Sequence, residues 1–188
     1  MIEIAVWSLI LVLLLAAILL AVLANRPGQH RLVIPSVGLV GLGILWTVYG
    51  GMATAPGQGF LIAAGIGLLL LGVIGGSPLV TLVLRLASRD SAALGSHGGI
   101  LVEDDESPAP EKREILRGGM AIGYLERLAL IGSALAGQIA AVAIIVAIKG
   151  LGRFSELENS EARERFIIGT LVSLIWAAAC AAPLVLAR

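Results

Sequence analysis

Charged and aromatic residues are both scarce in this sequence. Asp, Glu, Lys and Arg make up 14% of the 188 residues, and aromatic residues make up 4%. Soluble domains are typically about a quarter charged, so this composition argues against a water-soluble fold. The formal net charge is zero, which excludes a strong overall attraction to nucleic acid. We therefore expect no nucleic-acid partner.

Cysteine and histidine are nearly absent. The single cysteine, Cys180, excludes an intramolecular disulfide, and its apolar surroundings favour a small buried side chain. His30 and His97 lie in predicted loops without a second metal ligand nearby. The sequence also lacks a Gly-rich phosphate loop followed by Lys-Ser or Lys-Thr, His-Glu-x-x-His, Cys-x-x-Cys and Gly-x-Ser-x-Gly. We predict a protein that is not an enzyme and holds neither a metal nor a cofactor.

Long apolar runs fill most of the chain. Hydrophobic residues make up 58% of it, and several runs approach the ~20 residues needed to cross a bilayer core. The pattern predicts an all-α, polytopic integral membrane protein with about six transmembrane helices in two three-helix halves. The first half, 1–87, has predicted spans at 4–24, 32–51 and 60–76, with 78–87 kinked or lying in the interface.

Two segments of this N-terminal half, the first apolar run and the region of Gly75, Gly76 and Pro78, each have two interpretations. The first run could be a cleaved signal peptide, but Glu3 precedes it and no Lys or Arg does, which favours a retained span. Gly75, Gly76 and Pro78 predict a kink or break after the third span, because glycine and proline both weaken a helix. The segment after the break is then either a continuation of the helix or a short interfacial helix.

The segment 88–116 has a different composition. It carries seven acidic and three basic residues among Gly, Ser, Pro and Ala. Such a segment cannot bury enough apolar surface to fold alone. We predict a disordered, cytoplasmic linker between the two membrane halves.

The C-terminal half, 117–188, ends in a clear span at 166–186. Before it, the chain is compatible either with one span at 128–148 or with a helical hairpin of 118–136 and 138–153. Cytoplasmic loops are enriched in Lys and Arg. In the hairpin topology, the basic segment before the last span lies on the same side of the membrane as the first loop and the linker. In the single-span topology, that segment lies on the opposite side. We therefore predict the hairpin, turning at Gly137-Gln138. Both termini then lie outside the inner (cytoplasmic) membrane of the cell.

Three charges lie within the apolar hairpin. Glu126 lies 11 residues before Gly137, and Lys149 lies 11 residues after Gln138, so the two reach similar depth in an antiparallel hairpin. A lone charge near the bilayer centre costs about 3 kcal/mol or more, and pairing reduces that cost. Glu126, Arg127 and Lys149 are therefore the candidate intramembrane ion pair. Arg127 points about 100° away from Glu126, so it would snorkel or meet a carboxylate from elsewhere.

Small residues at helical spacing predict close helix packing in this half. The first arm of the hairpin carries a stripe that continues through Glu126 and Leu130, and the last span carries another that includes Ala177 and Cys180. The packing residues predicted from the two stripes are Gly119, Gly123, Ser133, Gly137, Gly169 and Ser173.

Three stretches of this half resemble a family of uncharacterised bacterial multi-pass membrane proteins. They are Ile122-Gly-Tyr-Leu-Glu-Arg127, Ala147-Ile-Lys-Gly-Leu-Gly-Arg-Phe-Ser-Glu-Leu157 and Ile168-Gly-Thr-Leu-Val-Ser173. The family pattern is roughly I-G-x-L-E-R, A-x-K-S-x-x-R-F-x-E and E-Y-x-x-I-G-T-L-x-S. Gly150 and Arg165-Phe166 depart from it. The resemblance implies that Glu126, Arg127, Lys149, Arg153, Phe154 and Gly169 act as a unit, and it brings no known reaction.

Two functions follow from these observations. The first is a non-enzymatic membrane scaffold or accessory subunit, whose partners are the lipid bilayer and either further copies of the chain or another membrane protein. The alternative is a small oligomeric transporter or channel, coupled to ions or protons through Glu126 and Lys149.

Overall fold

The computed structural model describes residues 1–49, 55–87, 100–103, 112–115, 119–138, 140–144, 147 and 160–186. Its elements are α1 (Ile2–Ala24), the 3₁₀-helix η1 (His30–Val33), α2 (Ile34–Val48), α3 (Gln58–Ala87), β1 (Ile100–Glu103), β2 (Lys112–Ile115), α4 (Gly119–Leu135) and α6 (Ser160–Leu186). Four helical stretches are long and apolar enough to cross a membrane: Ile2–Ala24, His30–Val48, Gln58–Ala87 and Arg163–Leu186. The predicted helical architecture is confirmed to that extent.

A tight turn joins α1 to α2. The side-chain amide of Asn25 donates to the carbonyl of Ala21 at 2.8 Å, which satisfies a carbonyl at the end of α1. Gly28 follows with φ +81°, a conformation that glycine adopts without strain. Pro35 lies in the first turn of α2, where its missing N–H is not needed. The buried hydroxyl of Ser36 then donates to the carbonyl of Ala17 at 3.1 Å and holds α2 against α1.

The third helix continues through the predicted break. α3 is one helix of 30 residues with Pro78 inside it. Of the two alternatives that the sequence left open for 78–87, the structure has the continuation of the helix. Gly75, Gly76 and Pro78 are all buried, so these residues face other helices instead of ending this one.

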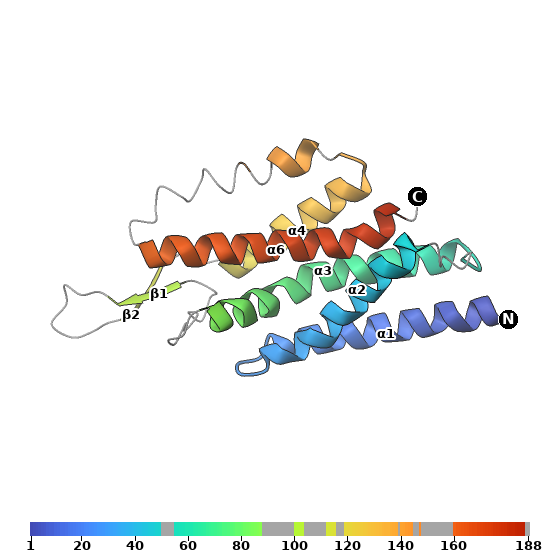
Figure 1. Cartoon of the computed structure of the whole chain (residues 1–188), viewed down its shortest axis with the longest axis horizontal. Helices are drawn as coiled ribbons and strands as arrows, with labels where there is room; N and C mark the ends of the chain where they lie inside the picture. Colours follow the sequence, from blue (N-terminus) through green and yellow to red (C-terminus); the bar gives the residue numbers. More distant parts are fainter. Residues whose placement is uncertain are drawn as a thin grey trace.

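The helices form a bundle around α3 (Figure 1). α3 contacts α1, α4 and α6, and α2 packs against α1 and α6. Both chain ends lie at one end of the bundle. The turn between α1 and η1, the last turn of α3 and the start of α6 lie at the opposite end (Figure 1).

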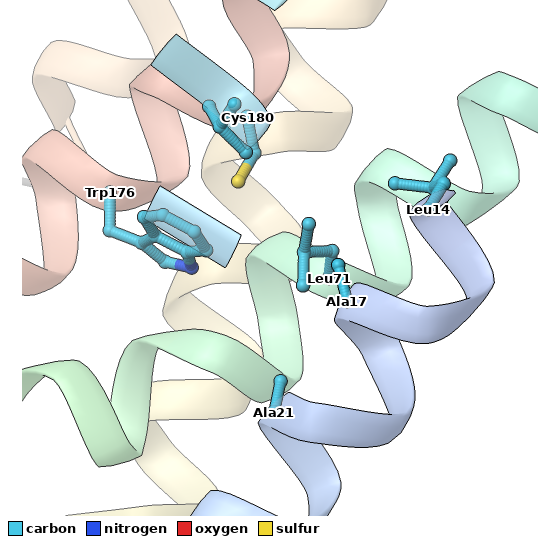
Figure 2. Close-up of a cluster of buried hydrophobic side chains, with 7 residues drawn as sticks. Leu14, Ala17, Ala21, Leu71, Trp176 and Cys180 are labelled. Carbon is cyan, nitrogen blue, oxygen red and sulfur yellow. The ribbon is translucent and has the colours of Figure 1, made fainter. Parts of the chain in front are cut away.

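A cluster of apolar side chains fills the junction of α1, α3 and α6 (Figure 2). Figure 2 shows Leu71 of α3 between the α1 side chains and the α6 pair of Trp176 and Cys180. Glycine allows the close approach: a Cβ added to Gly72 would lie 3.1 Å from the Cβ of Cys180, and one added to Gly75 would lie 3.0 Å from the Trp176 ring.

α4 ends in a left-handed turn. Gly137 has φ +72°, its N–H donates to the carbonyl of Ala134, and the N–H of Gln138 donates to the carbonyl of Ser133. This pair of bonds is the Schellman ending of a helix. Val142 then packs back on a second apolar cluster that includes Ile131. α4 thus ends in a turn at Gly137-Gln138. The predicted hairpin stays a prediction, because its return arm 138–153 is described only at 138, 140–144 and 147.

The count of six crossings stays a prediction. α4 has 17 residues, which corresponds to about 25 Å of helix and is shorter than the ~30 Å hydrocarbon core.

Part of the predicted linker has paired backbone. β1 and β2 form an antiparallel two-stranded ribbon, with Ile100 opposite Ile115 and Glu103 opposite Lys112. For these eight residues, the structure gives a β-ribbon where the sequence predicted disorder. The other positions of 88–116 lie outside the described residues.

Candidate functional site

The side chain of Arg127 lies between α3, α4 and α6. It is only 2% exposed, although it projects from the middle of an otherwise apolar helix. Its Nε donates to the carbonyl of Val73 at 2.8 Å and its Nη2 to the hydroxyl of Ser77 at 2.9 Å, both on α3. Its Nη1 donates to the hydroxyl of Ser173 on α6 at 3.0 Å. One guanidinium therefore joins three helices.

Glycines make room for this side chain. A Cβ added to Gly76 would lie 2.6 Å from both Cδ and Nε of Arg127, closer than atoms can approach without movement. On α4 itself, a Cβ added to Gly123 would lie 3.2 Å from Nη1. We call this space, formed by Gly76 and Gly123, the glycine notch. The extended part of the arginine crosses the backbone of α3 at the notch and so reaches acceptors on both neighbouring helices.

The proline in α3 is part of the same turn as the acceptors. Pro78 has no N–H, so the carbonyl of Ile74, four residues earlier, receives no helical hydrogen bond. Val73 precedes Ile74 directly, and a carbonyl oxygen has two lone pairs, so it can accept from Arg127 in addition to the helix. The stretch from Val73 to Pro78 thus provides space and two acceptors for a cation within a continuous helix.

The guanidinium has further favourable surroundings. Its Cζ lies 5.3 Å from the centre of the Tyr124 ring, within the range of a cation–π contact. Burying a charge is costly unless it is hydrogen-bonded. Hydrogen bonds that involve a charged group contribute about 1.5–3 kcal/mol each, so three of them offset much of that cost.

The structure corrects which charge of α4 faces the bundle. The predicted stripe passed from Gly123 through Glu126 to Leu130, but Gly123, Arg127 and Leu130 are the buried positions and Glu126 is half-buried. From the sequence, we predicted that Arg127 snorkels or meets a carboxylate. Its hydrogen bonds go instead to a carbonyl and two hydroxyls. Lys149 lies outside the described residues, so the Glu126–Lys149 pair stays a prediction.

The predicted packing residues of α6 lie where the sequence placed them. Ser173 is 4% exposed and binds Arg127. A Cβ added to Gly169 would lie 3.3 Å from Val80 of α3, so the two helices approach closely there. Ala177 and Cys180 of the same stripe are fully buried.

The packing residues predicted in the first arm of the hairpin divide into three groups. Gly123 contacts Arg127, as described above. Gly119 and Ser133 are half-buried, and the carbonyl of Ser133 accepts the bond that ends α4. Gly137 is exposed and serves the turn rather than helix packing. Of these residues, Gly123 lies next to Arg127, and Gly137 lies in the turn at the far end of the helix.

Sequence reasoning missed the α3 side of the site. Val73, Gly76 and Ser77 bind or admit Arg127, whereas the sequence interpreted their neighbourhood as a helix break. A polar side chain next to Gly-Gly in an apolar run was the available signal. Such a group needs a partner, and the only unassigned cation in an apolar run was Arg127.

No protein-family model, no curated protein and no solved structure matches this chain. The resemblance of the C-terminal half to a bacterial membrane-protein family therefore stays a prediction. Within the described ranges, no group of three or more His, Cys, Asp or Glu could hold a metal ion.

Proposed function

We propose that this chain is a multi-pass protein of the inner (cytoplasmic) membrane and that it acts as a non-enzymatic scaffold or accessory subunit. Its outer surface supports the membrane location. Large apolar side chains along α1 are more than half exposed, including Leu9, Val12, Leu15 and Leu19. In water such a surface would be an aggregation hazard, whereas lipid tails cover it at no cost.

Charge distribution supports an orientation with both termini outside. Arg26 lies in the turn after α1 and Arg31 lies in η1. Arg85 lies in the last turn of α3, and Arg163 and Arg165 lie in the first turns of α6. All of these elements meet at the end of the bundle opposite the termini (Figure 1). Basic residues are enriched on the cytoplasmic side, so this end faces the cytoplasm.

The scaffold assignment rests on how Arg127 is used. Ser77 lies eight residues before Arg85 in α3, and Ser173 lies eight residues after Arg165 in α6. Eight residues of helix are about 12 Å long, so in this orientation the Arg127 guanidinium lies about 12 Å from the cytoplasmic ends of the two helices. At that depth all three of its nitrogens bind internal groups of α3 and α6. These bonds fix the positions of three helices, and that is what a rigid membrane scaffold requires.

A transport role would use such a charge differently. Proton and ion pathways need polar groups in succession, facing a cavity or a water-filled path. Arg127 instead fills a glycine notch from which solvent is excluded. This observation favours the scaffold over a transporter or channel that uses Glu126 and Lys149.

The scaffold proposal is tested by isolating the full chain from its native membrane in mild detergent. We expect a homo-oligomer or a stable complex with another membrane protein, identified by mass spectrometry. Deletion of 88–116 is expected to release a partner that binds the linker. The control is flux into proteoliposomes: ion- or proton-dependent uptake that disappears in Glu126→Gln would overturn the scaffold in favour of transport.

The orientation is tested with single cysteines and a membrane-impermeant maleimide. Gln138 and Gln29 are both exposed and lie at opposite turns, so we expect Gln138→Cys to react in intact cells and Gln29→Cys only after permeabilisation. Cys180 is buried, and a Cys180→Ala background removes it from the reaction. If Gln138→Cys reacts only after permeabilisation, the hairpin enters from the cytoplasm without crossing, and the six-span topology is wrong.

A further inference from the structure

We propose that the corner between α1, η1 and the end of α3 binds the phosphate headgroup of an anionic phospholipid of the cytoplasmic leaflet. The segments that form this corner carry three arginines and a histidine: Arg26, His30, Arg31 and Arg85. This inference rests on the proposed membrane location. It is independent of Arg127, which lies about 12 Å deeper in the bundle.

The four side chains come from two segments that are distant in the sequence. Arg26 belongs to the turn between α1 and η1, His30 and Arg31 belong to η1, and Arg85 belongs to the last turn of α3. η1 packs against α3, and Arg85 is close enough to His30 for its charge to act on the imidazole. All three arginines are exposed. Arg85 therefore lies at the same end of the bundle as the basic residues that follow α1, although no local sequence motif collects them.

This surface lacks a negative partner within the described part of the chain, where no carboxylate pairs with Arg26, Arg31 or Arg85. Like charges held together repel one another, and an anion at their centre removes that repulsion. The corner thus favours an anion on electrostatic grounds.

His30 is held in a fixed orientation. Its Nδ1 lies 3.2 Å from the carbonyl oxygen of Ala24, the last residue of α1. A carbonyl can only accept, so Nδ1 carries the hydrogen, and Nε2 of the neutral ring is an acceptor. The donors for a phosphate oxygen are therefore the arginines, and the His30 bond fixes the backbone of η1 beside them.

Position and neighbouring apolar residues favour a lipid over a soluble phosphate. The corner lies at the cytoplasmic ends of membrane-crossing helices, where phospholipid phosphates are found. Ile34 and Leu86 adjoin the cations in the sequence and are more than half exposed, Leu86 at 74%. These side chains would contact acyl chains while the arginines hold the headgroup. Basic pockets between membrane helices on this side are known to bind anionic headgroups.

The test measures binding of short-chain phosphatidylglycerol and phosphatidylcholine to the full chain in neutral detergent, followed by thermal unfolding. We expect phosphatidylglycerol to raise the Tm and phosphatidylcholine to leave it unchanged. Each basic residue near an anionic surface contributes about a fivefold change in affinity. Single changes of Arg26, Arg31 or Arg85 to Gln should each weaken binding by about that factor. The double variant Lys112→Gln, Arg113→Gln removes the same kind of charge from the linker and should bind normally.

Three results would overturn the proposal. Equal responses to the two lipids would show that the headgroup is not recognised. A response to glycerol 1-phosphate at the same concentration would identify a soluble phosphate as the ligand. A response that appears only after Asp104, Asp105 and Glu106 are changed to amides would show that the acidic linker occupies the corner. A correctly oriented membrane protein without headgroup preference would refute this inference and leave the proposed function intact.

Discussion

Replacing Arg127 with methionine is expected to lower the free energy of unfolding by about 2 kcal/mol. Methionine has similar length and suits an apolar interior, but it loses the bonds to Val73, Ser77 and Ser173. The removal of a buried charge offsets part of that loss. The two serine hydroxyls can return to carbonyls of their own helices, which limits the damage further. The measurement is unfolding by SDS in mixed micelles.

Lysine at the same position is expected to be worse than methionine, with a loss of about 3 kcal/mol. It keeps the buried charge but lacks the planar fork that reaches Val73, Ser77 and Ser173 together. Arg85→Met, at an exposed arginine, should change stability by less than about 0.5 kcal/mol in neutral detergent. If Arg127→Lys is as stable as the natural protein, charge alone suffices. If Arg127→Met is more stable, the arginine does not hold the bundle together.

The spans and turns were accessible from the sequence because they depend on local properties. A charge-free run of sufficient length specifies a helix such as α1, whatever surrounds it. The turn at Gly137 was equally local, because the left-handed backbone that ends α4 favours glycine.

Local properties of the sequence do not predict which of the two charged residues of α4 faces the bundle. Glu126 and Arg127 are adjacent, and a helical stripe can step by three or by four residues. Only the partners decide between them, and these lie on α3 and α6, about 50 residues away in the sequence.

The same reason explains why the sequence left two alternatives open at Gly75 and Gly76. Their intrinsic preference argues for a break, but packing against Trp176 and Arg127 keeps them inside a continuous helix. Tertiary contacts override local propensity at such positions.

The glycine notch gives the second large effect. Gly76→Ala is expected to lower stability by about 2 kcal/mol, because the new Cβ displaces Arg127 from a position fixed by three hydrogen bonds. Gly38→Ala is the matched control. Gly38 also lies inside a helix, but nothing is within 4 Å of the added carbon. It should leave stability unchanged or raise it by up to about 1 kcal/mol, because alanine favours the helix.

A double-mutant cycle with Arg127→Ala then shows what the notch is for. If Gly76 is required only to admit the arginine, Gly76→Ala should cost nothing once the arginine side chain is gone, and the coupling energy should be about 2 kcal/mol. Strict additivity would show that Gly76 serves contact between the helix backbones regardless of Arg127. The cycle therefore separates a site built around one buried cation from ordinary small-residue packing of membrane helices.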